Sequence, residues 1–317
     1  MPITLQNIGE FKLLEKISKI VTKRNKSILL GVGDDCAIVR IDEKSKEELL
    51  LKSDATIEEI HFKSNINPEI VGHKAIGRVL SDIAAMGGKP KWALVNLVAR
   101  KSTKVYYIQG IYKGLKALAD KYQTIIVGGD TSCGKAIELH ITIIGTIPAG
   151  TAILRKGAKV GDLIYVTGTL GASIIKKHLN FEPRVKEGWW IRDNKIASAM
   201  IDISDGTLID LKRICSASSV SAKILLDKLP FSEDAIKQHK KNKQNLIKSA
   251  LTDGEDFELL LTVPKKYEDF INKKWPFKTK ITQIGEIING NGKVFGVDKD
   301  TIKEFELLLH GYEHFKS

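Results

Sequence analysis

Carboxylates follow the ends of strand-length apolar segments at several places in this chain. The turns concerned are Gly33-Asp34-Asp35, Ser53-Asp54, Gly129-Asp130, Asp202 to Gly206 and Asp253 to Asp256. A carboxylate beside apolar segments is costly to remove from water unless a cation meets it. A single Asp-Gly pair is explained by a turn. The whole set, with Asp82 inside the apolar segment 71–87, predicts a site for a divalent metal and a polyphosphate, because Mg²⁺ prefers oxygen ligands.

Apolar periodicity predicts strands and helices that alternate irregularly in both halves of the chain. The expected helices are 6–23, 71–87, 104–121, 171–178 and 207–215. The expected strands are 27–32, 37–41, 48–53, 92–98, 124–128, 137–146, 162–167, 222–226, 257–263 and 281–288. This order fits two α+β domains better than one doubly wound sheet. Pro148-Ala149-Gly150 is a candidate hinge, so we expect one domain over 1–148 and a second over 149–317.

The charge balance permits a nucleic-acid partner but does not favour one. Lys and Arg number 50 against 38 Asp and Glu, a formal net charge of +12. The lysines are scattered and are not interleaved with the aromatic residues that stack on single-stranded bases. Solvated lysine surfaces are the better interpretation, and we expect no nucleic-acid partner.

The same survey argues against a membrane or secreted protein. No apolar run approaches the length of a membrane span. The N-terminal residues do not resemble a secretory signal, and the three cysteines show no CxxC spacing. We therefore expect a cytoplasmic protein without a membrane partner.

One segment has the spacing of a phosphate-binding P-loop. Residues 129–135 read GDTSCGK and follow an apolar strand. Residue 136 is alanine, which has no hydroxyl for magnesium, and residues 137–144 are expected to form a strand in place of a helix. The segment is therefore not a Walker loop.

Seven motifs along the chain resemble those of the thiamine-monophosphate kinase family. They are GVGDDCAIV (31–39), SDATIEEIHF (53–62), KAIGRVLSDIAAMGGKPKWALVNL (74–97), VGGDTSCG (127–134), ILRKGAKVGDLIYVTGTLG (153–171), AMIDISDGTLIDL (199–211) and TDGEDFELLLTVP (252–264). The wider superfamily includes aminoimidazole ribonucleotide synthetase. The resemblance implies an N-terminal mixed-sheet domain for ATP binding and dimerisation, a C-terminal α/β sandwich, and a homodimer. It also implies the last step of thiamine diphosphate biosynthesis, in which Mg²⁺ assists direct in-line phosphoryl transfer from ATP to thiamine monophosphate.

The resemblance also implies roles for particular residues. The implied ligands of several Mg²⁺ ions are Asp35, Ser53, Asp54, Asp82, Asp130, Asp202 and Asp205. The implied ATP contacts are Tyr112, Gly129, Asp130, Arg155 and Ser204. The implied thiamine contacts are His61, Glu255 and Tyr312. Catalysis would rest on Arg155 and, through Mg²⁺, on Asp130, Asp202 and Asp205.

Two departures and two alternatives accompany the resemblance. Asp253 stands where the family usually has glycine, and Thr131-Ser132-Cys133 replaces the usual Thr-Thr-Arg. One alternative is another ATP-dependent synthetase of the superfamily, similar to aminoimidazole ribonucleotide synthetase. The other is a non-catalytic basic relative that binds nucleotides or nucleic acid.

Overall fold

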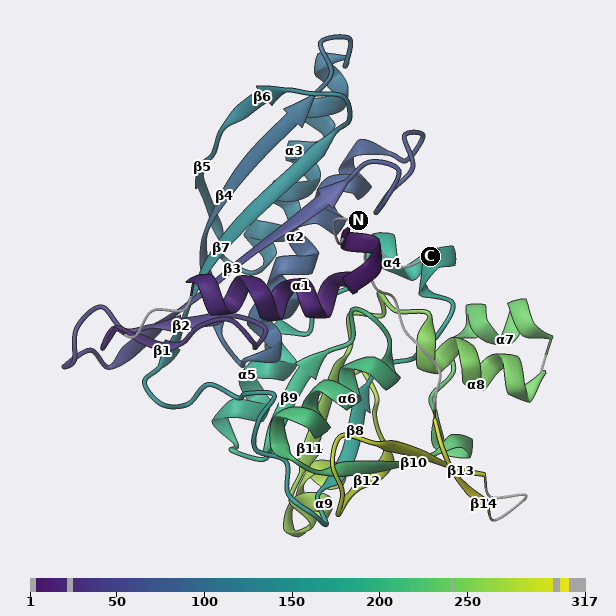
Figure 1. Ribbon diagram of the computed structural model, residues 1–317. Helices are drawn as coiled ribbons and strands as arrows, with labels where there is room; N and C mark the ends of the chain where they lie inside the picture. The colour runs from purple at the N-terminus through teal and green to yellow at the C-terminus, as the bar shows by residue number, and fades with distance from the viewer. Residues whose placement is uncertain (1–3, 22–24, 241, 299–302, 308–317) are drawn as a thin grey trace.

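The first half of the chain forms a mixed seven-stranded sheet (Figure 1). The computed structural model describes residues 4–21, 25–240, 242–298 and 303–307. The strands of this sheet are β1 (Ile28–Leu30), β2 (Ala37–Val39), β3 (Glu47–Ile57), β4 (Lys89–Ala99), β5 (Ile125–Gly128), β6 (Thr131–Cys133) and β7 (Glu138–Pro148). Their order is β1-β2-β3-β7-β4-β5, and β6 also pairs with β4. The pairs β4–β5 and β4–β6 are parallel and the others antiparallel, as expected for a mixed sheet.

The second half forms another mixed sheet, ordered β14-β13-β10-β12-β8-β11-β9. Its strands are β8 (Leu163–Thr167), β9 (Ala199–Asp202), β10 (Ser221–Leu225), β11 (Leu259–Val263), β12 (Ile281–Ile288), β13 (Val294–Asp298) and β14 (Lys303–Glu306). Among the described strands of this sheet, β10 and β13 are the one parallel pair. Two such sheets with helices packed on them confirm the predicted α+β class.

The helices cover the two sheets differently. The N-terminal half contains α1 (Leu5–Val21), α2 (Pro68–Ala85) and α3 (Val105–Lys121). The C-terminal half contains α4 (Lys177–Asn180), α5 (Val185–Asp193), α6 (Thr207–Ser218), α7 (Glu233–His239), α8 (Lys243–Thr252), α9 (Glu268–Lys274) and the 3₁₀ turns η1 (Ser173–Ile175), η2 (Leu226–Lys228) and η3 (Lys265–Tyr267). Both faces of the second sheet are buried, since alternate residues of β8 and β11 belong to two separate cores. In the described part of the chain, one face of the first sheet is open to solvent at β4, where Trp92 and Leu94 are 42% and 41% exposed.

Helix α2 lies between the two halves and is buried over most of its length. It begins with Pro68 after Asn67, whose side chain accepts a hydrogen bond from Glu69 N, an arrangement that suits a helix start. Its residues contact α3 and β3 on one side and α4, α5 and β9 on the other. The core of the first half therefore continues through α2 to the inner face of the second sheet.

Several elements differ from the sequence-based expectation. β3 extends to Ile57, beyond the predicted end at 53. The predicted helix 171–178 is divided into η1 and α4, because Ala172 (φ 55°) and Lys176 (φ −155°) leave the helical region. The expected hinge coincides with the end of β7 at Pro148 and a turn at Gly150 (φ 71°).

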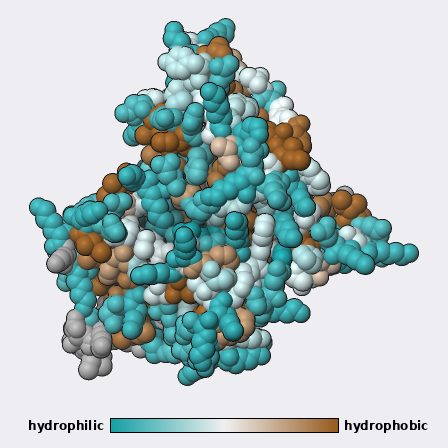
Figure 2. Space-filling view, turned by 180° about the vertical axis from the view of Figure 1, so that it is seen from behind, coloured by the Kyte–Doolittle hydropathy of each residue, from teal (hydrophilic) through white to brown (hydrophobic). Residues whose placement is uncertain are grey.

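Hydrophilic and hydrophobic side chains are distributed unevenly over the surface. On the face seen in Figure 2, hydrophilic residues predominate and hydrophobic residues form separate patches. Within the described ranges, every helix is too short or too polar to cross a membrane.

Candidate active site

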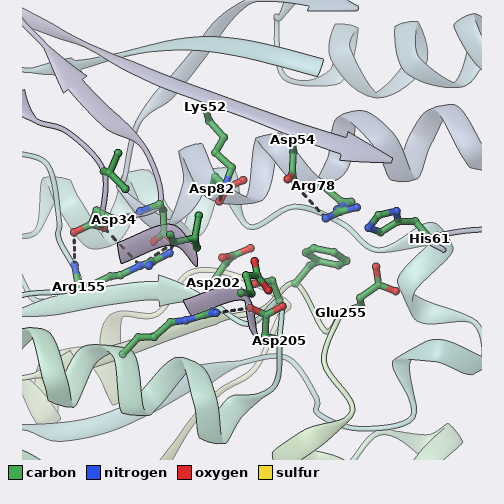
Figure 3. Close-up of a pocket in the computed structure, with 18 of the residues that line it drawn as sticks. Asp34, Lys52, Asp54, His61, Arg78, Asp82, Arg155, Asp202, Asp205 and Glu255 are labelled. Carbon is green, nitrogen blue, oxygen red and sulfur yellow. Dashed lines mark hydrogen bonds and ion pairs between the residues drawn. The ribbon is translucent and has the colours of Figure 1, made fainter. Parts of the chain in front are cut away.

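A cleft of about 660 Å³ opens where the two halves meet (Figure 3). Its walls come from α1, the β1–β2 loop, β3, α2, the β9–α6 loop and the turn between α8 and β11. In Figure 1, α1 runs across the front of this junction. Nine residues predicted for the site line the cleft: Asp35, Asp54, His61, Asp82, Arg155, Asp202, Ser204, Asp205 and Glu255.

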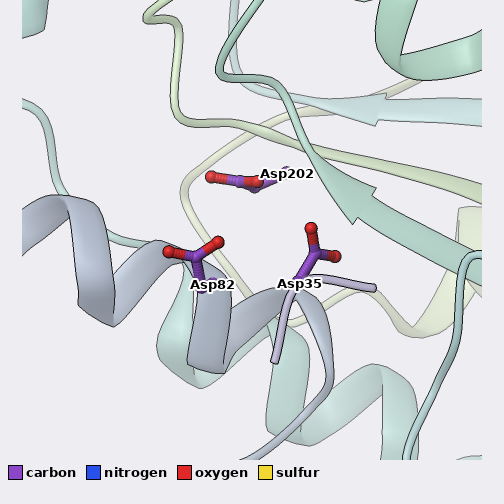
Figure 4. A group of neighbouring side chains, drawn as sticks. All are labelled: Asp35, Asp82 and Asp202. Carbon is purple, nitrogen blue, oxygen red and sulfur yellow. The ribbon is translucent and has the colours of Figure 1, made fainter. Parts of the chain in front are cut away.

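Three buried carboxylates converge at one end of the cleft, which we call the donor end (Figure 4). Ligand atoms of Asp35, Asp82 and Asp202 all lie within 4.8 Å of one another. Burial raises the pKa of Asp82 well above its usual value. Burial, aided by the charge of Asp35, raises the pKa of Asp202 to about 6. These pKa shifts arise because like charges in a water-poor site oppose ionisation, and an added cation would relieve them.

Cationic side chains surround the carboxylates. They come from β3, α2, the β7–β8 connection and α6, so both halves contribute. A guanidinium matches the two oxygens of a carboxylate or a phosphate, which suits such a site to a polyphosphate. The ion pairs are Lys52–Asp82 (2.8 Å), Arg155–Asp35 (2.5 Å), Arg78–Asp54 (3.1 Å) and Arg213–Asp205 (2.6 Å).

The β9–α6 loop is held in place by a carboxylate that does not line the cleft. Buried Asp210 of α6 accepts hydrogen bonds from the backbone N of Ser204 (3.1 Å) and of Asp205 (3.2 Å). Burial raises the pKa of Asp210 to about 8, although Arg213 at 2.5 Å opposes this effect. Asp210 therefore fixes the position of the two predicted site residues before it.

His61 and Glu255 mark the other end of the cleft, which we call the acceptor end. Burial, with help from the charge of Arg78, lowers the pKa of His61 to about 4, so its ring is neutral near pH 7. His61 Nδ1 accepts a hydrogen bond from Ile57 N (3.0 Å), which leaves the proton on Nε2. Burial opposes ionisation of Glu255, but hydrogen bonding and the charge of a nearby lysine outweigh it and lower its pKa to about 2. The acceptor end thus presents a neutral imidazole and a carboxylate.

Two predicted residues that the structure describes, Ser53 and Tyr112, do not line the cleft. Side chains alternate between the faces of a strand, and Ser53 Oγ accepts a hydrogen bond from Thr142 Oγ1 (3.1 Å). Tyr112 is half-buried against the first core. Tyr312 lies outside the described residues.

The Gly129-Asp130 turn also lies away from the carboxylate cluster. Strands β7 and β4 separate β3, which holds Asp54, from β5, which the turn follows. At strand spacing this is a separation of roughly 14 Å. A Cβ atom on Gly129 would lie 1.8 Å from Val95 O, so the close backbone contact is itself a reason for glycine.

Several cleft residues were not predicted from the sequence, among them the cations Lys52, Arg78 and Arg213 and the apolar Leu14 of α1. Spacing is the one signal that could have found the cations. Lys52 is two residues before Asp54 on a strand, and Arg78 is four residues before Asp82 on a helix, so each shares a face with a predicted site residue.

Known proteins are similar to this chain over almost its whole length. The model for the AIR synthase related protein, N-terminal domain, matches residues 33–147. Thiamine-monophosphate kinase of Buchnera aphidicola subsp. Acyrthosiphon pisum is 35% identical, over 96% of this chain and 98% of the relative. Thiamine-monophosphate kinase of Escherichia coli K12 is 37% identical, over 81% and 83%. A solved structure, AaThiL complexed with AMPPCP and TMP, is 32% identical and superposes with a TM-score of 0.85 over 99% of both chains.

Proposed function

Because this chain belongs to the thiamine-monophosphate kinase family, we propose that the cleft between its two halves is where it carries out that reaction. The protein is an enzyme that phosphorylates thiamine monophosphate to thiamine diphosphate with ATP. The observation that supports the location best is the convergence of Asp35, Asp82 and Asp202 beside Arg155. AMPPCP is an ATP analogue, and the relative that binds it shares this fold.

We propose that magnesium binds at the donor end. The residues fit the ion, since three carboxylates supply hard oxygen ligands and Asp35 Oδ2 is buried without a hydrogen-bond partner among the described residues. Asp35, Asp82 and Asp202 would hold it, with Asp54 and Asp205 at the rim of the same cluster. Bound magnesium would neutralise the negative charge that develops on the transferred phosphoryl group.

The side chains at the donor end have to offset the repulsion between two anions, the ATP triphosphate and the phosphate of thiamine monophosphate. The acceptor is a phosphate oxygen that is ionised near neutral pH, so no general base is required. Arg155 is fixed by its bond to Asp35, and its guanidinium can bind a phosphate oxygen without reorganising. We propose that Arg155 and Ser204 contact ATP, and that Asp202 and Asp205 act on the reaction through magnesium.

The acceptor end suits a cationic heteroaromatic ring. Ionised Glu255 attracts the positive charge of thiamine, and neutral His61 adds no repulsion. Phe257 also lines the cleft and offers an aromatic face to a cation. We propose that His61 and Glu255 contact the thiamine moiety, and that Tyr312 joins them as the family resemblance implies.

Some predicted contacts require a site larger than the cleft. We propose that Gly129, Asp130 and Tyr112 contact ATP and that Ser53 and Asp130 are also magnesium ligands. We also propose a cytoplasmic location, where the co-substrate ATP is found. Residues 1–148 would form the ATP-binding and dimerisation domain, and 149–317 would complete the phosphate and thiamine site.

We propose that the enzyme is a homodimer joined through its N-terminal sheets. Four large apolar side chains occupy the uncovered face or edge of that sheet, and such patches mark protein interfaces. They are Trp92 (42% exposed), Leu94 (41%), Ile125 (61%) and Val127 (56%).

The test is phosphoryl transfer from γ-labelled ATP to thiamine monophosphate, with magnesium and with EDTA, followed by chromatography of the products. Labelled thiamine diphosphate should form only with magnesium. ATP binding without thiamine diphosphate would contradict the assigned acceptor, and aminoimidazole precursors would be tried next.

A further inference from the structure

Lys74 of α2 is a fully buried lysine at the acceptor end, and the reaction described above does not use it. A buried ammonium is costly unless each of its donors meets an acceptor. Its Nζ atom contacts three partners from three different segments. Lys74 Nζ lies 2.7 Å from His61 O, 2.8 Å from His178 Nδ1 and 2.8 Å from Glu255 Oε1.

These partners belong to both halves of the molecule. His61 follows β3, His178 is in α4, and Glu255 is in the turn between α8 and β11. Glu255 has φ 51°, so its backbone takes the left-handed conformation that is unfavourable for glutamate, and its N donates to Ser204 O (2.7 Å). The main chain of Glu255 is therefore tied to the donor end, while its side chain is tied to Lys74.

The spacing of residues along α2 sets the distance between the two ends of the cleft. Lys74, Arg78 and Asp82 are four residues apart and lie on nearly the same face. They contact Glu255, Asp54 and Lys52 in that order. Eight residues of helix separate Lys74 from Asp82 by about 12 Å along the axis. A rigid helix thus fixes the distance from the carboxylate cluster to the acceptor end.

We propose that Lys74 is a positioning residue for the acceptor substrate, holding His61 and Glu255 at a set distance from the phosphate-binding carboxylates. The inference rests on the proposed acceptor role of Glu255. Because Lys74 acts through Glu255, its removal should weaken binding of thiamine monophosphate and leave ATP binding unchanged.

The experiment is a double-mutant cycle on Lys74 and Glu255. KM is measured for both substrates in the wild type, Lys74→Met, Glu255→Gln and the double variant. Lys74→Met should raise the KM of thiamine monophosphate roughly tenfold or more, as expected when a buried charge loses its partner, with the KM of ATP within about twofold. In the Glu255→Gln background the same change should add less than about twofold, because coupled residues are not additive.

Lys177→Met is the matched control. Lys177 is also a mostly buried lysine, bonded to Glu258 (2.8 Å) in the segment that contains Glu255, but it does not line the cleft. This variant should lower stability and leave both KM values unchanged. If Lys74→Met fails to fold, the double variant takes its place, because the double variant leaves neither charge unpaired. The KM of thiamine monophosphate in the double variant is then compared with that in Glu255→Gln. Equal KM values support the proposal.

Two results would overturn the proposal. Additive effects on KM, or equal increases for ATP and thiamine monophosphate, would assign Lys74 to folding alone. Calorimetric binding of thiamine monophosphate to the wild type separates this outcome from a wrong function. If Lys74→Met binds thiamine monophosphate as tightly as the wild type does, only the Lys74 proposal is overturned. If the wild type neither binds nor phosphorylates thiamine monophosphate, the proposed function is overturned as well.

Discussion

Asp202 illustrates how single residues determine the character of the cleft. It is the last residue of β9, it is buried, and its Oδ2 accepts a hydrogen bond from Ser81 (2.6 Å). Burial and the charge of Asp35 raise its pKa to about 6, which means that the metal-free protein pays free energy to keep it ionised at neutral pH. A residue of this kind lowers stability unless a cation binds beside it.

Asp202→Asn should therefore lower the activity of the enzyme and raise the stability of the metal-free protein. Turnover should fall at least about a hundredfold, because the variant loses charge that acts at the transition state. The thermal midpoint of the metal-free protein should rise by a few degrees, since a buried like-charge repulsion is removed. Asp227→Asn, at an exposed position, should change neither. Near-wild-type turnover of Asp202→Asn would contradict the assigned role.

The contribution of Glu255 to the stability of the fold should decrease as the pH is lowered. Its pKa is about 2 in the folded protein against an ordinary 4.5, so its ionised form stabilises the fold above pH 4.5 by about 3 kcal/mol. This contribution is lost as the pH falls from 4.5 to 2. In urea unfolding, the free-energy difference between wild type and Glu255→Gln should shrink between pH 5 and pH 3. Glu43→Gln, at an exposed position, should show no such trend, and a constant difference for Glu255→Gln would show that ionised Glu255 does not stabilise the fold.

At this scale the sequence identifies acids better than bases. Asp35, Asp82 and Asp202 are predictable because a carboxylate in an apolar setting requires an explanation. Lys52 and Arg78 each share a face with a predicted acid, but 50 basic residues are spread along the chain, so this spacing alone does not single them out. Lys74 would be read as one more exposed lysine, and only the fold shows that it is buried.

At the scale of elements, α2 and α3 pack at a distance that only glycine permits. A Cβ atom on Gly114 of α3 would lie 1.9 Å from Glu69 O of α2, and one on Gly72 of α2 would lie 1.9 Å from Ile111 O of α3. The close contact sets the position of α2, and α2 in turn provides Asp82 to the cleft.

Gly114→Ala should consequently disturb both folding and catalysis. Because backbone atoms would have to move, we expect a loss of about 1–3 kcal/mol in unfolding free energy and a lower kcat. Chemical denaturation and the kinase assay provide the measurements. Gly31→Ala, where no atom lies within 4 Å of the added Cβ, is the control and should be close to neutral. A fully stable Gly114→Ala would show that the two helices can separate freely.

Long periodic elements were predicted closely, and several short ones were missed. α2, α3 and β7 match their predicted ranges closely, because an apolar face repeats over many residues. β9 (Ala199–Asp202), β13 and β14 were missed, because four or five residues carry little periodicity and the position of such strands depends on their neighbours in the sheet, although β8 and β10 of similar length were predicted.

At the scale of the whole molecule, the uncovered face of the first sheet remains to be explained. Trp92 of β4 is paired in register with Ile125 of β5, and both are exposed. If this face joins two copies, Trp92→Lys should convert a dimer to a monomer in sedimentation analysis, because a charge would be buried in an apolar interface. Ile236→Lys, an exposed apolar position in α7, should leave the dimer unchanged. A monomeric wild type would contradict the proposed assembly.

The assignment of the cleft depends on the carboxylates at the junction of the two halves, which we propose hold the metal that serves ATP. Its most direct test is a titration with Mn²⁺ in the presence of AMPPCP, followed by electron paramagnetic resonance, in the wild type and in Asp82→Asn. We expect tightly bound Mn²⁺ in the wild type and a loss of at least one bound ion, or about a tenfold weaker affinity, in the variant. Identical titrations of the two proteins would show that the metal is held elsewhere and would contradict the assignment of the cleft.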